Sequence, residues 1–312
     1  GYGIASFVRP FTAIAQTATQ VLAIRVSDRV GKGLRSSPRD ALLADSVDPS
    51  QRGRAFGFHA AADNAGAVLG PLAAFALIKW GGLSLRSVFW IAAIPAIVAF
   101  IVLVVAVKED RTVLPESAKK IEKPQLGGQM GSKFWAYLFV LLVFTLGNST
   151  DAFLLLRANE LGISIALAPV VWAFLNFVKS STGVLGGALS DKVGRKPLIV
   201  GGWLLYAAVY YGFARASSSW HAWALFAAYG VFYGMTEGVE KALVADIVPA
   251  NRRGAAFGWF NLAIGLGALP ASLIFGSLWD SAGAPTAFLF GASLALTAAA
   301  GMTFFVPIAR KT

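Results

Sequence analysis

Cysteine is absent from this sequence, and histidine is nearly absent, because His59 and His221 are the only two. Without cysteine the chain cannot form disulfide bonds, thiolate metal sites or cysteine nucleophiles. The two histidines are too far apart in the sequence to suggest a metal-binding cluster, and no nucleophile motif accompanies them. We therefore predict no metal site and no cofactor, and we do not expect an enzyme.

Charged residues are also scarce. They make up 14% of the 312 residues, whereas 56% are hydrophobic and the mean hydropathy is +0.64. A soluble domain is about a quarter charged, so these few charged groups could not cover the surface of a soluble protein of this size. The composition therefore predicts a membrane protein that is surrounded by the lipid bilayer.

Long apolar runs recur through the whole chain. A helix that crosses a bilayer needs roughly 20 mostly apolar residues. A soluble protein with buried helices rarely contains so many runs of this length. We predict an all-α, polytopic helix bundle with ten spans, at about 1–18, 20–44, 55–78, 87–107, 134–156, 164–188, 197–214, 220–245, 255–277 and 284–307.

The polar connections between these runs differ in charge. The longest, 108–133, and the short ones at 189–196 and 246–254 are rich in lysine and arginine, and the tail ends in Arg310 and Lys311. Lysine and arginine favour the cytoplasmic side of short loops. We therefore predict a multi-pass protein of the cell membrane with both termini of this chain in the cytoplasm. The net charge of +11 then reflects topology, and we predict no nucleic-acid partner.

Two segments of the chain repeat each other. ALLAD at 41–45 returns as ALVAD at 242–246, an offset of 201 residues (246 − 45). RGRAFG at 52–57 returns as RGAAFG at 253–258 with the same offset. Two similar helix bundles explain such a repeat, because many transporters are built from repeats. The predicted parts are a bundle at 1–107, a cytoplasmic linker at 108–133 and a second bundle at 134–312.

The offset has a consequence for the first bundle. Counterparts of the spans at 134–156 and 164–188 would fall before residue 1. The apolar run that starts at Gly1 has no cationic n-region and no cleavage site, so we do not predict a signal peptide. We expect the chain to hold about ten spans of a twelve-span pattern, without the first two.

The predicted span at 20–44 is unusual because it carries many charges. On a helix these side chains lie along one stripe. In a soluble protein the stripe would be a solvated face, whereas in a membrane it would face a water-filled path, since charge inside a bilayer is costly. We favour the path. The candidates for substrate binding or coupling in this stripe are Arg25, Asp28, Arg29, Lys32, Arg35 and Arg39.

Other polar residues in the spans are few. A carboxylate in a low-dielectric cavity can exchange protons near neutral pH, so Asp63, Glu237 and Glu240 are predicted proton-coupling residues. Asn148 and Asp151 are further candidates for substrate binding or coupling. Aromatic residues of these spans either line a path or pack between helices.

The offset also relates two charged helices, because it equates Arg39 and Asp40 with Glu240 and Lys241. These four either line a cavity or form pairs that gate the cytoplasmic end, and both possibilities remain open. The arginines of the stripe are expected to face acids across a central cavity, with Arg25, Arg35 and Arg39 opposite Glu237, Glu240, Asp63 or Asp151.

Two segments combine small residues with charge or proline. GALSDKVGRKPL at 187–198 places small residues at the end of one predicted helix and a charged turn before the next. GAVLGPLA at 66–73 has two glycines four apart, which is the close-packing spacing of membrane helices, and a proline that adds a kink. These segments are an ordinary turn and ordinary packing, or they are conformational motifs. The residues concerned are Gly66, Gly70, Pro71, Gly187, Asp191, Gly194, Arg195 and Lys196.

The same segments resemble motifs of the major facilitator superfamily. GGALSDKVGRKPL at 186–198 is similar to the family's loop motif, in the copy between spans eight and nine. Arg25 with Gly31 and Gly33 resembles the motif of the fourth span. GAVLGPLAA at 66–74 is similar in part to the Gly-Pro motif of the fifth span, which is associated with drug–proton antiporters. The resemblance implies two bundles that rock around a site at the membrane midplane.

The function implied by this resemblance is secondary transport of a small solute by alternating access. The Gly-Pro segment suggests efflux coupled to protons. The cationic stripe at 25–39 suggests instead the transport of an organic or inorganic anion, and a remnant that does not transport is a further alternative. We expect the chain to act as a monomer.

Overall fold

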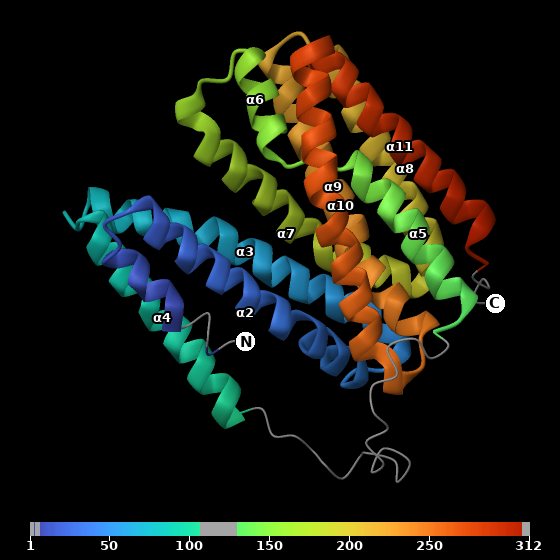
Figure 1. Cartoon of the computed structure of the whole chain (residues 1–312), viewed down its shortest axis with the longest axis horizontal. Helices are drawn as coiled ribbons and strands as arrows, with labels where there is room; N and C mark the ends of the chain where they lie inside the picture. Colours follow the sequence, from blue (N-terminus) through green and yellow to red (C-terminus); the bar gives the residue numbers. More distant parts are fainter. Residues whose placement is uncertain (1–2, 4–6, 107–129, 308–312) are drawn as a thin grey trace. The chain divides into compact units, whose positions relative to one another are not determined.

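The structure is a computed structural model that describes residues 3, 7–106 and 130–307 (Figure 1). Within these residues it is helical, without strands. The chain divides into two compact units, and each is described by itself. Unit 1 comprises 1–39 and 70–128, and unit 2 comprises 40–69 and 129–312.

The two units divide helices α2 and α3 between them. Unit 1 holds the 3-10 helix η1, most of α2, the second half of α3, and α4, which packs against η1. Unit 2 holds the end of α2, η2 and the first half of α3. The bounds are η1 Arg9–Ala13, α2 Ala18–Asp45, η2 Pro49–Gln51, α3 Arg52–Lys79 and α4 Leu85–Ala106.

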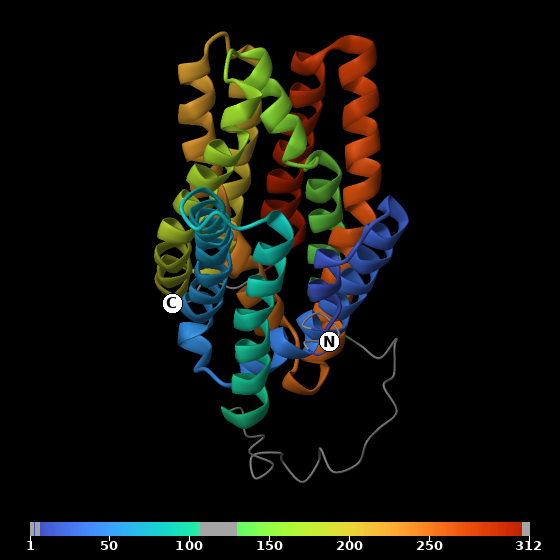
Figure 2. The same cartoon turned by 90° about the vertical axis from the view of Figure 1, so that its left-hand side faces the viewer.

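The remaining helices all belong to unit 2. Here α7 packs against α9, α8 against α9 and α11, and α5 against α10 and α11. Both views show α8, α9, α10 and α11 running roughly alongside one another (Figure 2). The bounds are α5 Ser132–Gly147, α6 Ala152–Glu160, η5 Ile165–Leu167, α7 Ala168–Val193, α8 Arg195–Arg215, α9 Ser219–Ile247, η6 Ala250–Arg252, α10 Arg253–Ala282 and α11 Ala284–Phe305.

Seven helical segments of the described residues are long and apolar enough to cross a membrane. The long helices α2 and α9 are not among them. The prediction of ten spans is therefore not confirmed, and the first predicted span, 1–18, lies partly outside the described residues. The predicted linker at 108–133 lies almost entirely outside them, so the predicted bundle limits stay a prediction.

The predicted span at 134–156 is divided between two helices. Helix α5 ends at Gly147 and α6 begins at Ala152. Between them, the polar run of Asn148, Ser149, Thr150 and Asp151 interrupts the apolar sequence. Polar side chains of this kind compete for backbone hydrogen bonds, which favours turns over helix interiors. The break brings polar groups into the middle of unit 2.

Aromatic side chains fill the core of unit 2 around this break. The ring of Phe144 stacks on Trp203 at a centroid distance of 4.7 Å, and Tyr206 stacks on Tyr210 at 4.1 Å. Large apolar side chains such as Phe139 lie on the outside of the same helices. A soluble monomer rarely exposes extended apolar surface, so these faces suit a lipid environment.

Candidate functional site

Helix α3 begins against the end of α7. The carboxylate of Asp191, near the end of α7, accepts hydrogen bonds from the backbone N–H groups of Gly53 at 3.0 Å and Arg54 at 2.8 Å. The first N–H groups of a helix have no partner within the helix, and the N-terminus attracts negative charge. A residue of one helix thus caps the start of another.

Arg195 connects this cap to the end of α9. Its guanidinium lies 2.5 Å from Asp191 Oδ1 and 3.0 Å from Asp246 Oδ2, and it donates to Ser190 Oγ at 2.6 Å. Gly194, the residue before it, has a φ of 97°, which favours glycine. The turn between α7 and α8 is therefore shaped so that Arg195 reaches two carboxylates.

Lys196, the next residue, reaches a different helix end. Its ammonium donates to the carbonyl oxygens of Thr303 and Val306, each at 2.9 Å. These carbonyls are at the C-terminus of α11, where a cation satisfies unpaired carbonyl groups. The three predicted charged residues of the turn therefore join the ends of α3, α7, α9 and α11.

The two copies of the sequence repeat exchange partners at this end. Arg52 lies 2.8 Å from Asp246, and Arg253, its counterpart, is paired with Asp45, the counterpart of Asp246. Each arginine also donates from Nε to the carbonyl eight residues before it, Ala44 or Ala245, at 3.2 Å. The four side chains thus form two reciprocal ion pairs.

At two positions, a residue contacts its own counterpart in the other copy of the repeat. Lys241 Nζ lies 3.1 Å from Asp40 Oδ2, and the rings of Phe56 and Phe257 have centroids 5.9 Å apart. The pairing of Asp40 with Lys241 agrees with the gate hypothesis for these residues. We call this set of charged residues the charged clamp: Asp40, Asp45, Arg52, Asp191, Arg195, Lys241, Asp246 and Arg253.

Glycines bring the helix backbones together beside the charged clamp. A Cβ atom placed on Gly187 would overlap the carbonyl oxygen of Gly53, and one placed on Gly57 would overlap that of Gly183. Small residues allow membrane helices to approach this closely. At Gly66 and Gly70, by contrast, a Cβ atom would meet nothing within 4 Å. Close packing at those two residues, and a role for Pro71, stay predictions.

A buried polar cluster lies at the break between α5 and α6. Tyr229 donates from its hydroxyl to Asp151 Oδ1 at 2.8 Å, and Lys179 Nζ lies 3.7 Å from Asp151 Oδ2. The Lys179 ammonium also lies 3.6 Å from the ring centroid of Tyr233 and 5.8 Å from those of Trp172 and Tyr229. One carboxylate and three aromatic rings therefore surround one ammonium.

Hydroxyl groups surround the helix break. Tyr206 donates to the carbonyl oxygen of Gly147 at 2.9 Å, and its oxygen lies 3.4 Å from Asn148 Oδ1. The hydroxyls of Ser149 and Tyr210 are buried and make no hydrogen bond of normal geometry to any residue that the structure describes. We call the whole group the lysine cluster: Asn148, Ser149, Asp151, Trp172, Lys179, Tyr206, Tyr210, Tyr229 and Tyr233.

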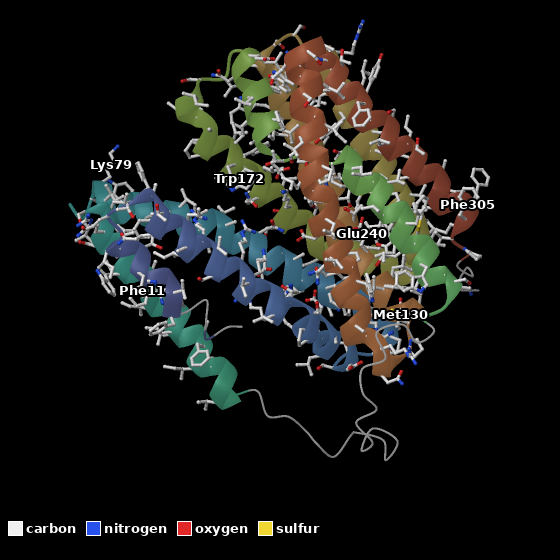
Figure 3. The ribbon with its side chains drawn as sticks, in the orientation of Figure 1. Phe11, Lys79, Met130, Trp172, Glu240 and Phe305 are labelled. Atoms are coloured by element: carbon white, nitrogen blue, oxygen red, sulfur yellow. The ribbon has the colours of Figure 1, made fainter. Side chains whose placement is uncertain are left out.

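The other predicted acids have separate partners. Asn64 donates to Glu237 at 3.4 Å, and Glu237 is near enough to Lys179 to interact with its charge. Glu240, further along α9, accepts a hydrogen bond from the Trp203 indole at 3.0 Å. Figure 3 labels Glu240 on α9 and Trp172 on α7. The acids of α9 therefore connect to the lysine cluster at Glu237 only.

Comparison with known proteins identifies the family. The family model described as Major Facilitator Superfamily matches residues 1–178 and 152–312. The chain belongs to this superfamily. An uncharacterized MFS-type transporter of Methanocaldococcus jannaschii is 31% identical over 302 residues, which are 95% of this chain and 74% of that protein. The multidrug resistance protein MdtH of Cronobacter sakazakii is 28% identical over 116 residues, which are 37% of this chain and 29% of that protein.

Solved structures share the fold. A double Trp mutant of XylE has a TM-score of 0.81 at 18% identity, over 100% of this chain and 79% of that one. The human organic anion transporter MFSD10 has a TM-score of 0.75 at 16% identity, over 96% and 75%. The prediction of an all-α transporter of the major facilitator type is confirmed. The protein is a multi-pass membrane protein of a transporter family and not an enzyme.

The cationic stripe of the sequence lies on α2 in unit 1. Three of its members are exposed and three are half-buried. The acids that were expected to face it belong to unit 2, so pairing across a central cavity stays a prediction. The exposed members are Arg25, Arg29 and Lys32, and the half-buried ones are Asp28, Arg35 and Arg39.

Sequence reasoning missed the residues with the most informative contacts. Lys179 was visible as a cation within an apolar run, but nothing in the sequence indicated that it would meet Asp151. Arg52 and Arg253 were visible only as repeated residues. The repeat itself was the available signal, because charged residues that occur in both copies indicate positions with the same structural role in each copy.

Proposed function

We propose that the protein is a secondary transporter that moves a small solute across the membrane by alternating access. The observation that carries this proposal is the charged clamp. Alternating access requires one end of the bundle to close firmly in one state and to open in another. Ion pairs and glycine contacts suit this role because they can separate without exposing a large apolar core.

The energies are of the right size for a reversible closure. A partly exposed ion pair contributes about 0–1 kcal/mol, while removing one partner of a buried pair costs about 3–5 kcal/mol. Arg195 is 6% exposed and Asp246 is 27% exposed. Their ion pair is therefore expected to contribute an energy between these two ranges. A few such pairs hold an end shut, and a ligand of moderate affinity can still shift the equilibrium.

We propose that the charged clamp closes the cytoplasmic end. The connections beside it, 189–196 and 246–254, carry the lysine and arginine excess of short cytoplasmic loops. The same orientation places both termini of this chain in the cytoplasm of a cell-membrane protein. A single chain contains all the contacts that the charged clamp needs, which supports a monomer.

We further propose that transport is coupled to protons and directed outward, as antiport. The coupling candidates are Glu240, which is buried, Asp151 and Glu237, which are half-buried, and Asp63, which is exposed. A partial likeness to MdtH, named as a multidrug resistance protein, supports the outward direction. Proton coupling is supported by the likeness to XylE, a proton:xylose symporter of the same fold.

Anion transport is a second candidate function. The observation that favours it is the group of exposed cations Arg25, Arg29 and Lys32 on α2. These cations would attract an anionic solute. In this case neutralising Arg35 would abolish transport of the anion and have little effect on a cationic solute.

Transport assays with the full chain in proteoliposomes test the proposal. An imposed proton gradient should drive accumulation of a fluorescent organic cation such as ethidium, and a protonophore should abolish it. Accumulation that is unchanged by the protonophore would contradict proton coupling. Accumulation of a small carboxylate such as benzoate that is lost in Arg35→Ala would support the anion alternative.

A further inference from the structure

We propose that the lysine cluster is a binding site for an organic cation and that Lys179 is its internal ligand. The ammonium of Lys179 occupies the place of the substrate's ammonium, and the two exclude each other. This inference rests on the proposed transport function and adds to it the class of substrate and the group that carries the exchanged proton.

The surroundings of Lys179 are those that recognise an ammonium group. Cations bind over aromatic faces within about 6 Å of the ring centroid, and aromatic cages bind quaternary ammonium ligands. Tyr233 at 3.6 Å and Trp172 and Tyr229 at 5.8 Å meet this distance around Lys179 Nζ. Asp151 supplies the opposite charge at 3.7 Å. The same groups supply the contacts that a substrate cation would need.

The carboxylate is the accessible partner of this pair. The Asp151 side chain is 18% exposed, and that of Lys179 is 8% exposed. The distance of 3.7 Å from Asp151 Oδ2 to the ammonium is also longer than a hydrogen bond of about 2.7–3.2 Å. The Asp151 carboxylate is therefore more exposed than the ammonium with which it pairs, and its Oδ2 retains capacity to accept a hydrogen bond.

The charges around Lys179 favour a cation over an anion. The charged groups that face it are Asp151, from the break between α5 and α6, and Glu237, from α9. The titratable hydroxyls beside it are those of Tyr229 and Tyr233 on α9. Two carboxylates oppose one ammonium, so an added anion would be repelled unless both acids were neutral.

Binding of a cation requires that Lys179 lose its proton. With the lysine charged, a second cation would lie beside a like charge in the same cage. In the exchange, one Nζ–H bond breaks, the proton leaves to water, and the electron pair stays on the neutral amine. The substrate cation then takes the place opposite Asp151, and the net charge of the cluster is unchanged. One proton is released for each cation bound, which is the stoichiometry of an antiporter.

Direct binding to the purified full chain tests this exchange. The probe is benzyltrimethylammonium, whose charge does not depend on pH, and titration calorimetry at pH 6 to 9 measures its affinity. For the unmodified protein the affinity should rise with pH, by up to about tenfold per unit, because binding releases one proton. Asp151→Asn should lose binding at every pH.

Two substitutions of the lysine distinguish exchange from a structural role. Lys179→Gln should bind the probe at least as tightly as the unmodified protein does at pH 9, without pH dependence. Lys179→Arg should not bind it at any pH, because a guanidinium in a protein cannot be deprotonated. Lys79→Gln is the matched control, since Lys79 also lies over an aromatic ring, 5.3 Å from the Phe75 centroid, but belongs to unit 1. It should retain the pH dependence.

Several results would overturn the inference. If Lys179→Gln and Lys179→Arg lose binding equally while both keep the thermal stability of the unmodified protein, Lys179 supports the structure and is not exchanged. If benzoate binds instead and Lys179→Gln loses it, the site takes anions. Absence of cation binding at all pH values in the folded protein also contradicts the proposal. Because these are binding measurements, a failure of alternating access would leave them unchanged.

Discussion

The two copies of the sequence repeat have different surroundings. At the start of α3, Gly53 and Gly57 contact the backbone of α7, and a Cβ atom at either would overlap a carbonyl oxygen. At the start of α10, their counterparts Gly254 and Gly258 have nothing within 4 Å of such an atom. Nearly the same six residues therefore form a tight contact in one copy and an open helix face in the other.

The difference distinguishes the arginines of the charged clamp from the glycines beside it. The arginines behave alike in both copies, because each bonds a preceding carbonyl and the opposite aspartate. The glycines do not. The reciprocal ion pairs thus follow the sequence repeat, whereas the close contact of α3 with α7 occurs in one copy only, and we propose that this contact provides the tight closure. Substitutions at matched positions can test this division.

The largest effect is expected at Gly57. In Gly57→Leu the side chain would collide with the backbone at Gly183, and overpacking of this kind costs about 1–3 kcal/mol or more. The closed form should therefore lose about tenfold or more in population. Gly258→Leu should have little effect. Because the chain has no cysteine, spin labels on Gln51→Cys and Lys192→Cys report the distance across the closure without background.

A smaller effect is expected from Asp191→Asn. This change removes the charge beside Arg195, which is 6% exposed, and weakens the cap on α3, so closure should be destabilised by about 1–3 kcal/mol. Glu160→Gln is the control, because Glu160 pairs with Arg157 at 44% exposure, where an ion pair is worth about 0–1 kcal/mol. Equal changes in the melting temperature of the two variants would contradict the assignment of Asp191 to the closure.

The reciprocal ion pairs should differ from each other. Asp246 is 27% exposed and contacts both Arg52 and Arg195, whereas Asp45 is 46% exposed and contacts Arg253. Asp246→Ala should therefore cost about 1–2 kcal/mol and Asp45→Ala less than about 1 kcal/mol. Double-mutant cycles with the facing arginines, read from melting temperatures, measure both couplings. A larger coupling at Asp45 would reverse the order that we propose.

The smallest effect is expected at Asp63, whose counterpart in α10 is Ile264. Its side chain is 68% exposed and lies 3.9 Å from His59. Asp63→Asn should change the closure by less than about 0.5 kcal/mol. The distance between the two labels should keep the distribution of the parent chain. A clear shift of this distance would show that residues further along α3 than the contacts indicate also take part in the closure.

The sequence predicted the class of fold and part of the site. Apolar runs and scarce charge are properties of single segments, and they indicated a helical membrane protein correctly. The repeat indicated which arginines and aspartates are equivalent. It could not predict that Arg52 would pair with Asp246 instead of Asp45, because that choice depends on how the two copies are arranged in space.

The helix break and its lysine were harder to predict. Four polar residues in a row at 148–151 were a signal for the break, but they were included in one continuous span. The meeting of Lys179 with Asp151 joins two helices through a contact that no spacing in the sequence encodes. The stripe on α2 was the strongest charge signal of the sequence, and its partners stay a prediction.

One measurement tests the central claim most directly. The claim is that the contact between α3 and α7 closes and opens during transport. With spin labels on Gln51→Cys and Lys192→Cys in the full chain in lipid nanodiscs, we predict two distances, a short one for the closed form and a longer one whose share increases in Asp191→Asn. A single short distance in every condition, unchanged by Asp191→Asn and by Gly57→Leu, would contradict the account.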